Sequence, residues 1–358
     1  FVDAYADIVR GALRVDREEL LRGARAIGLM SGTSMDGIDI ALVRTDGEFT
    51  VERGPSMGVA YPPEFRRTLS AALETAKAIE KREERPGNLV AVERDLTLRH
   101  AEAVGLFLER FGISSQEIDL IGFHGQTVLH RPLQALTVQI GDGALLALQT
   151  GIPVVYDMRA NDMVHGGQGA PLVPAFHRAI FGTSSTDVAV LNLGGIANIT
   201  LLPGLDPAGV RGFDTGPANG LMNEWAERHL GQAYDADGAW AASGRCDEHL
   251  LAALLADPYF SLPPPKSTGR SYFHLPWVEQ RFPGLARLAA ADVQATLAEL
   301  TARSVAADIR AHGPGTRRVL VCGGGSRNGY LMDRLRAHLP GCAVQPSDDY
   351  GLDADWIE

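Results

Sequence analysis

The feature that most constrains the fold is a strand–turn–strand pattern that occurs twice along the chain. In the first copy, apolar runs over 26–30 and 38–43 flank a polar turn that contains glycine. In the second copy, apolar runs over 188–193 and 196–202 flank the pair Gly194-Gly195. Two apolar runs separated by a short glycine turn are typical of a β-hairpin. The repetition predicts two similar halves that each begin with a hairpin.

The segments between and after the hairpins show alternating helix and strand patterns. The first half is predicted to contain a helix over 89–111 and strands over 120–123, 137–140 and 154–156. The second half is predicted to contain helices over 221–230, 249–255, 293–312 and 328–339, with a strand over 318–322. Such an alternation indicates a mixed sheet flanked by helices in each half.

A chain of 358 residues is long enough for about two domains. We therefore expect an α/β fold with an N-terminal lobe over 26–156 and a C-terminal lobe over 157–358. Residues 1–25 are expected to form an N-terminal extension, with a surface helix over 3–23.

Charge and cysteine content exclude several classes of protein. The net charge of −11 argues against a nucleic-acid or anionic-membrane partner, because such partners require clustered Lys and Arg. No apolar run approaches the roughly 18 residues of a membrane span, and the first 25 residues do not resemble a signal peptide. Three scattered cysteines, Cys246, Cys322 and Cys342, are too few for a disulfide framework. We therefore expect a cytoplasmic protein.

Three glycine-bearing loops are candidates for binding phosphate, because small residues let backbone N–H groups approach phosphate oxygens. The first, residues 31–39, adds hydroxyl groups and two carboxylates that could hold Mg²⁺. The second, residues 192–198, has two consecutive glycines flanked by asparagines. The third, residues 322–328, follows a predicted strand and opens a helix. The alternative interpretations, plain hairpin turns and a plain helix N-terminus, stay open.

Acidic and amide residues form a second group of candidates. Asp214 ends an apolar run just before a Gly-Pro turn and a predicted helix, so it could be a functional carboxylate or the N-cap of that helix. The segments 124–127 and 157–159 also follow strand-like runs, where ligand sites of α/β proteins gather. Residues 166–174 form another glycine-rich loop. The histidines lack the spacing of metal ligands, which argues against a zinc hydrolase.

Two rival motifs are weaker. The glycines from Gly323 onward fall short of a dinucleotide fingerprint because position 328 is Asn, so a dehydrogenase is a secondary alternative. The triplet 266–268 ends like a phosphate-binding P-loop, but prolines stand where the glycines of that motif belong. We predict that residues 263–270 form a rigid surface loop instead.

Over residues 26–358 the sequence resembles the anhydro-N-acetylmuramic acid kinases, a family of the sugar kinase, heat-shock chaperone and actin superfamily. The resemblance lies in the motifs GLMSGTSMDGID, GFHGQT, VQIGDGALLA, GGQGAPLVPAFH, LNLGGIANIT, GFDTGPAN, DGAWAASG, PKSTGR, FHLPW and VLVCGGGSRN. It implies two similar lobes of the actin-like ATPase type around a central cleft. It also implies that ATP binds in this cleft. The family reaction converts 1,6-anhydro-N-acetylmuramic acid, ATP and water to N-acetylmuramic acid 6-phosphate and ADP.

The resemblance implies roles for individual residues. Asp214 is expected to be the catalytic base, and Asp36 and Asp39 are expected to hold Mg²⁺. The residues expected to bind ATP are Gly32, Thr33, Ser34, Met35, Asp36, Gly37, Ile38, Asp39, Gly194, Gly195, Gly323, Gly324 and Gly325. The residues expected to bind the sugar are Ser31, His124, Gln126, Arg159, Asn161, Pro217, Asn219 and Glu358.

The chain departs from the family pattern at Met158, Ala160, Asn161 and Ala218. It also stops at Glu358, where family members continue, so we expect a C-terminal tail to be missing. Other actin-fold sugar kinases remain an alternative, as does a non-enzymatic nucleotide switch. A homodimer is compatible with the sequence.

Overall fold

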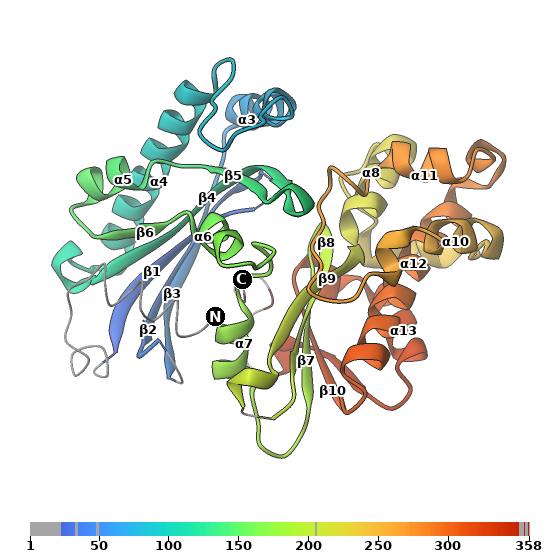
Figure 1. Ribbon diagram of the computed structural model, residues 1–358. Helices are drawn as coiled ribbons and strands as arrows, with labels where there is room; N and C mark the ends of the chain where they lie inside the picture. Colours follow the sequence, from blue (N-terminus) through green and yellow to red (C-terminus); the bar gives the residue numbers. More distant parts are fainter. Residues whose placement is uncertain are drawn as a thin grey trace. The chain divides into compact units, whose positions relative to one another are not determined.

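The computed structural model describes residues 23–32, 35–47, 50–204, 206–350, 354 and 357 (Figure 1). Contacts within the chain divide it into two compact units, Phe1–Ile180 and Phe181–Glu358. The lobe boundary expected near residue 157 stays a prediction. The predicted helix over 3–23 lies almost entirely outside the described residues.

The first unit is a six-stranded sheet with helices packed on it. Its strands are β1 (Ala24–Ser31), β2 (Gly37–Thr45), β3 (Val51–Ala60), β4 (Leu120–Arg131), β5 (Leu136–Ile140) and β6 (Val154–Tyr156). Its helices are α3 (Pro63–Ala76), α4 (Leu89–Phe111), α5 (Gly143–Thr150) and α6 (Met158–Val164), and α7 (Pro174–Phe181) follows at the boundary. Helix α4 packs against α3, α5 and strands of the sheet, and its buried face carries Leu96, Val104 and Phe107.

The second unit has a five-stranded sheet and more helices. Its strands are β7 (Val188–Leu193), β8 (Ile196–Leu202), β9 (Arg211–Pro217), β10 (Arg318–Cys322) and β11 (Ala343–Pro346). Its helices are α8 (Asn219–Leu230), α9 (Ala239–Ser243), α10 (Glu248–Leu255), α11 (Leu275–Arg281), α12 (Ala290–His312) and α13 (Gly329–His338).

Both sheets are built on the same topology. In the first unit, β1 pairs with β2 and β2 with β3 in antiparallel fashion, whereas β1–β4 and β4–β6 are parallel. In the second unit, β7–β8 and β8–β9 are antiparallel, whereas β7–β10 and β10–β11 are parallel. This repetition confirms the prediction of two similar α/β lobes. The cleft expected between the lobes stays a prediction.

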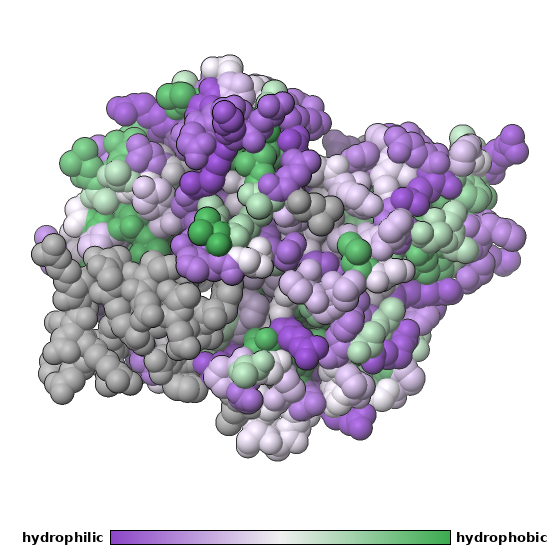
Figure 2. Space-filling view, in the orientation of Figure 1, coloured by the Kyte–Doolittle hydropathy of each residue, from purple (hydrophilic) through white to green (hydrophobic). Residues whose placement is uncertain are grey.

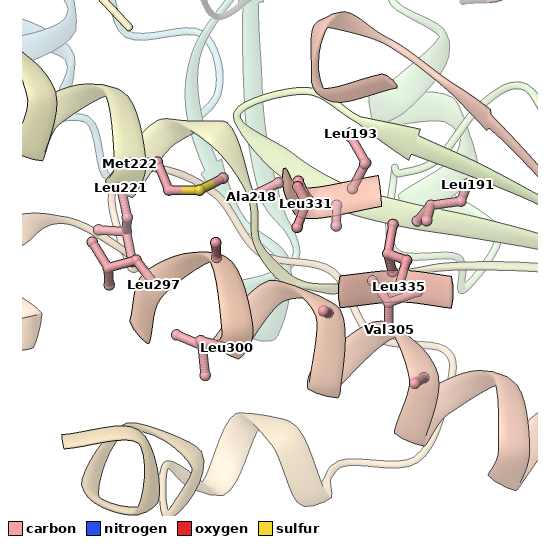
Figure 3. Close-up of a cluster of buried hydrophobic side chains, with 14 of the residues drawn as sticks. Leu191, Leu193, Ala218, Leu221, Met222, Leu297, Leu300, Val305, Leu331 and Leu335 are labelled. Atoms are coloured by element: carbon pink, nitrogen blue, oxygen red, sulfur yellow. The ribbon is translucent and has the colours of Figure 1, made fainter. Parts of the chain in front are cut away.

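The core of the second unit lies between β7 and the helices α8, α12 and α13 (Figure 3). Leu191 and Leu193 extend from β7 toward the helices, where Leu297 of α12 and Leu331 of α13 are also fully or almost fully buried. Alternate residues of a strand point to opposite faces, so these two leucines cover one face of the sheet. The end of β7, where the glycine pair follows, is therefore anchored in the core.

A buried carboxylate also ties α13 to α12. Glu299 accepts hydrogen bonds from Arg303 Nε at 2.8 Å, Arg334 Nε at 2.6 Å and His338 Nε2 at 2.7 Å. Burial alone would raise the pKa of Glu299, but these hydrogen bonds outweigh it and lower the pKa to about 2. The contacts hold in place the helix that follows the third glycine loop.

On the face shown in Figure 2, hydrophobic residues are scattered among hydrophilic ones. Among the residues that the structure describes, no helix has both the length and the apolar character needed to cross a membrane.

Most of the predicted elements are present. Both hairpins form, α4 and β6 have the predicted bounds, and β4 is longer than predicted. Strands β3 and β11 were not predicted. The prediction that residues 263–270 form a surface loop is wrong in one respect, because Lys266 and Ser267 are buried.

Candidate active site

A β-bulge in β4 places His124. Leu29 of β1 pairs with Phe123, but the next paired residue of β1, Ser31, lies opposite Gln126, so β4 has one extra residue in this interval. Gly125 has φ of 67°, and a Cβ atom there would lie 2.5 Å from the carbonyl oxygen of Ile140. Only glycine fits this position. A bulge of this kind changes the direction in which a side chain points.

Ser31 and Gln126 join β4 to the first loop. Ser31 Oγ donates a hydrogen bond to Gln126 Oε1 at 2.7 Å, and Gln126 Nε2 donates to the carbonyl oxygen of Gly32 at 3.2 Å. Ser31 Oγ also lies 2.9 Å from the hydroxyl of Tyr61. Burial raises the pKa of Tyr61, so this hydroxyl keeps its proton. The network fixes the start of the loop at the carboxyl end of β1.

His124 and Arg159 form a second contact in this unit. Arg159 Nε donates a hydrogen bond to His124 Nε2 at 2.9 Å, while His124 Nδ1 lies 2.7 Å from the carbonyl oxygen of Gly125. These partners fit a neutral imidazole with its proton on Nδ1. Burial, followed by the charge of Arg159, lowers the pKa of His124 to about 3. Arg159 also donates to the carbonyl oxygen of Gly169 at 2.7 Å.

The first hairpin has two exposed carboxylates, Asp36 in the turn and Asp39 in β2. Met35 has φ of 55°, and its N–H donates to the carbonyl oxygen of Gly32 at 3.1 Å, which closes the turn. Asp36 and Asp39 are exposed, and both act electrostatically on the Tyr61 hydroxyl. Thr33 and Ser34 lie outside the described residues, and so does Glu358.

The carboxylates of this hairpin suit Mg²⁺. That ion prefers oxygen ligands and commonly combines one or two carboxylates with water and phosphate oxygens. Within the described part of the chain, no group of three or more His, Cys, Asp or Glu residues is arranged to hold a metal. Two carboxylates alone would leave most ligand positions of Mg²⁺ to water or phosphate oxygens.

The two glycine loops of the second unit lie against each other. Gly323 has φ of 76°, and a Cβ atom there would lie 2.2 Å from Asn192 Oδ1. A Cβ atom on Gly325 would lie 2.5 Å from that of Leu193. This close approach follows from the topology, because β7 and β10 are parallel neighbours in which Asn192 pairs with Cys322. Their carboxyl ends meet at one edge of the sheet, where ligands of α/β proteins bind.

The turn after β7 also contacts the start of α8. The carbonyl oxygen of Gly195 accepts hydrogen bonds from Ala218 N and Gly220 N, both at 3.1 Å. Asn219 N donates to the carbonyl oxygen of Gly194 at 3.0 Å, and Asn219 Nδ2 donates to that of Leu193 at 2.7 Å. These contacts fix the turn and satisfy N–H groups at the helix start.

Asp214 is a buried strand residue rather than a helix cap. It lies within β9, whereas the N-cap of α8 is Ala218, so the helix-cap interpretation is wrong. Only 5% of Asp214 is exposed. Thr268 N donates to Asp214 Oδ2 at 2.8 Å, and Asp214 N donates to the carbonyl oxygen of Lys266 at 3.0 Å. Ala218 has φ of −131°, so its φ lies outside the left-handed region that favours glycine.

The predicted site residues thus form separate clusters within the units. In the first unit, Ser31, Gly32 and Gln126 are in contact, and His124 contacts Arg159. In the second unit, Gly194, Gly195 and Asn219 are in contact, and the loop 323–325 lies beside them. Asp214 and Pro217 lie on β9, where the carbonyl oxygen of Pro217 accepts from Thr301 Oγ1 at 2.9 Å. Asn161 lies on α6.

Sequence reasoning missed two residues that touch the site. Tyr61 follows β3, a strand that was itself not predicted, so no signal pointed to it. Thr268 belongs to the family motif PKSTGR and to the loop predicted over 263–270, but it was not predicted to be a site residue. Asp214 is contacted by the backbone N–H of Thr268, and because every residue except proline has such a group, the sequence does not reveal this contact.

Known proteins resemble the chain over most of its length. A family model described as anhydro-N-acetylmuramic acid kinase matches residues 24–358. The protein of that name from Xanthomonas axonopodis pv. citri is 52% identical over 336 residues, which are 93% of this chain and 88% of that protein. The protein of that name from Cupriavidus pinatubonensis is 48% identical over 345 residues, 94% of this chain and 89% of that protein.

Among solved structures, the chain is similar to an activator of 2-hydroxyisocaproyl-CoA dehydratase from Clostridium difficile with bound ADPNP. The two are 10% identical, with a TM-score of 0.45 over 94% of this chain and 90% of that chain.

Proposed function

Because the chain belongs to the anhydro-N-acetylmuramic acid kinase family, we propose that it phosphorylates 1,6-anhydro-N-acetylmuramic acid at the expense of ATP. The products are N-acetylmuramic acid 6-phosphate and ADP, so the reaction returns cell-wall sugar to metabolism. The family match over residues 24–358 carries this proposal. Neither the dehydrogenase nor the non-enzymatic switch is favoured by any relative described above.

The substrate dictates unusual chemistry. Oxygen 6 of an anhydro sugar is bonded to carbon 1, so a kinase cannot simply deprotonate a hydroxyl at carbon 6. In our proposal, water attacks carbon 1, and Asp214 takes its proton, as the base of an inverting glycosidase does. The bond between carbon 1 and oxygen 6 breaks, and oxygen 6 attacks the γ-phosphorus. ADP leaves, and Asp214 later releases the proton to solvent.

The environment of Asp214 supports its role as the base. Its carboxylate is buried, and the N–H of Thr268 fixes one oxygen at 2.8 Å. A base that is held in one orientation aligns its lone pair with the attacking water, and such alignment contributes strongly to rate. The strand position of Asp214 further supports the role, because it removes the competing explanation of a helix cap.

The three glycine loops are proposed to bind ATP. In the second unit, the loops after β7 and β10 would place the backbone beside the nucleotide, and residues 32–39 of the first unit would supply further contacts. Asp36 and Asp39 would hold Mg²⁺, which supplies positive charge to phosphate oxygens during transfer. Preorganised N–H groups contribute to the same neutralisation.

The sugar is proposed to contact the first-unit cluster together with Asn161, Pro217, Asn219 and Glu358. Both ring nitrogens of His124 already have partners, Arg159 and the carbonyl oxygen of Gly125. We therefore propose that His124 acts by orienting Arg159, whose guanidinium is the charged group suited to an acidic sugar. A cytoplasmic location and a homodimer stay predictions.

The activity is tested with purified protein, the anhydro sugar, ATP and Mg²⁺. We expect mass spectrometry to detect sugar 6-phosphate in proportion to the ADP formed. Free N-acetylmuramic acid serves as the control substrate, because it needs no ring opening. If the protein phosphorylated only the control sugar, a simple kinase would replace this proposal.

The second glycine loop offers a clean test of ATP binding. A Cβ atom on Gly194 would meet nothing closer than 3.7 Å, so the fold has room for a side chain there. We expect Gly194→Val to weaken ATP binding about tenfold or more, because the side chain occupies the approach to the backbone. Calorimetric titration measures the affinity, and thermal melting checks the fold.

The matched control for Gly194→Val is Gly341→Val, since a Cβ atom on Gly341 meets no atom within 4 Å. Gly341 lies outside the predicted ATP loops, and its replacement should leave ATP affinity unchanged. Equal affinities for the two variants would remove the loop after β7 from the nucleotide site.

A further inference from the structure

We propose that Lys266 and Asp308 are positioning residues for the reaction. Their buried ion pair holds the main chain of residues 266–268 along the edge of β9 and so fixes the carboxylate of Asp214. This inference rests on the role of Asp214 in the proposed function. It gives a role in the reaction to residues 266–268, which lie in the segment 263–270 that was predicted to be a surface loop.

The segment completes an edge of the sheet. Strand β9 is the last strand of its sheet, so one side of its backbone has no neighbouring strand. On that side, Asp214 N donates to the carbonyl oxygen of Lys266 at 3.0 Å. Two residues later, Thr268 N donates to Asp214 Oδ2 at 2.8 Å. The same short segment therefore binds both the backbone and the carboxylate of Asp214.

The ion pair anchors this segment to the core. Lys266 Nζ lies 3.2 Å from Asp308 Oδ1 and 3.1 Å from Oδ2, and Lys266 and Asp308 are only 3% and 6% exposed. Asp308 belongs to α12, which packs against β8 and β9 and four helices. The lysine thus connects a segment without regular structure to the central helix of the unit.

Aromatic rings enclose the ammonium group. Lys266 Nζ lies 5.9 Å from the ring centroid of Phe213 and 5.2 Å from that of Tyr259. The hydroxyl of Tyr259 donates to the carbonyl oxygen of Asp214 at 2.8 Å. A cation at these distances is attracted to both ring faces. Phe213 precedes Asp214 in the sequence, Tyr259 is hydrogen-bonded to Asp214, and Asp308 belongs to α12.

A buried ion pair of this kind is better explained by geometry than by stability. Removing two charges from water offsets most of their attraction, so apolar residues of similar volume would serve stability as well. The pair does impose one arrangement, because the ammonium and the Asp308 carboxylate must meet in the interior, where Nζ lies 3.2 Å from Oδ1 and 3.1 Å from Oδ2. The N–H of Thr268 restricts the rotation of the Asp214 carboxylate about its terminal bond, and a base must be aligned within about 10–20°.

The test replaces both charges together, so that no buried charge loses its partner. We expect Lys266→Met with Asp308→Asn to lower kcat about 10- to 100-fold, because a small misplacement of a reacting group has an effect of that size. The KM for ATP should stay within about twofold. The control variant Arg228→Met with Glu279→Gln removes an exposed ion pair elsewhere in the unit and should keep the wild-type kcat.

A mutant cycle that combines the double replacement with Asp214→Asn distinguishes an effect on the position of Asp214 from a general disturbance of the structure. If the pair acts through the Asp214 carboxylate, the double replacement should leave the residual rate of the Asp214→Asn protein unchanged within about twofold. A purely structural role would lower the residual rate by the same factor as in the wild type. That outcome would overturn the proposal, and so would a wild-type kcat in the double variant.

A second experiment removes only the hydrogen bond and does not depend on the folding of the double variant. Replacing Thr268 by its α-hydroxy acid analogue converts the amide to an ester and deletes the N–H that contacts Asp214. We expect kcat to fall about tenfold. The control is Thr268→Val, which keeps the N–H and should retain a higher kcat than the ester protein. An ester protein with wild-type kcat would contradict the inference.

Different experimental results would contradict the proposed function and this inference. A wild-type protein that does not phosphorylate the anhydro sugar would contradict the proposed function, and with it this inference. An active wild type with an unaffected double variant would contradict this inference alone.

Discussion

Asp214→Asn is expected to lower the rate of sugar phosphorylation by about 10² to 10⁴-fold, because it removes the general base but keeps the shape of the side chain. Ring opening and phosphate transfer should fall together, since one attack of water drives both. Affinity for ATP should be unchanged. Stopped assays that measure sugar phosphate and ADP in the same samples test the coupling.

The variant is a sharp probe because the contacts of the side chain are largely preserved. An asparagine oxygen can still accept the hydrogen bond from Thr268 N, which is 2.8 Å from Asp214 Oδ2. Asp214→Asn should therefore melt close to the wild-type temperature. Near-normal turnover by the variant would remove Asp214 from the chemistry and leave it a structural residue of β9.

Labelled water locates the bond that forms. In water enriched in heavy oxygen, the wild-type product should carry the label at carbon 1 and none in the transferred phosphate. Label in the phosphate would mean that water attacks phosphorus, which contradicts the proposed mechanism.

Strong periodic patterns account for the part of the fold that could be predicted. The runs of β7 and β8 are buried along almost their entire length, and α4 has apolar residues at helical spacing over 23 residues. Strand β3 lacks such a pattern, because Gly54, Pro55 and Gly58 interrupt a strand that is mostly exposed or half-buried. Strand β11 has only four residues and ends in Pro346.

The candidate site also contains some parts that could be predicted from the sequence and others that could not. The glycine loops and Asp214 could be proposed as site residues because the chemistry expected of them depends on residue types in short motifs. The segment 263–270 could not be placed, because the partner of Lys266 is Asp308, 42 residues away on another element. Prolines at 263–265 argue against a helix or strand, but they do not distinguish an exposed loop from one packed against a strand edge.

The largest expected effect on stability comes from breaking the buried ion pair on one side. Lys266→Met should lower the free energy of unfolding by about 3 to 5 kcal/mol at pH 8, because Asp308 would then be a buried charge without its cation. For a unit of this size the melting temperature should fall by roughly 6 to 20 °C. Arg228→Met, which breaks an exposed pair, should change it little.

The loss of stability caused by Lys266→Met should become smaller as the pH falls. Burial raises the pKa of Asp308, while Lys266 and, more weakly, His312 oppose this shift. Without Lys266 the pKa rises further, so the folded variant takes up a proton more readily than the unfolded chain does. A group whose pKa is raised on folding favours the folded state at low pH and loses that contribution as the pH rises through the raised pKa.

Melting curves of Lys266→Met and wild type between pH 5 and pH 8 measure this effect. We expect the gap in melting temperature to be smaller at pH 5, because a larger fraction of Asp308 is protonated there than at pH 8. When Asp308→Asn is added to Lys266→Met, most of the difference in melting temperature from the wild type should disappear at every pH, because no unpaired charge is left. A gap that stayed constant with pH would mean that the lost packing of the lysine stem, and not the uncompensated carboxylate, determines the stability of this segment.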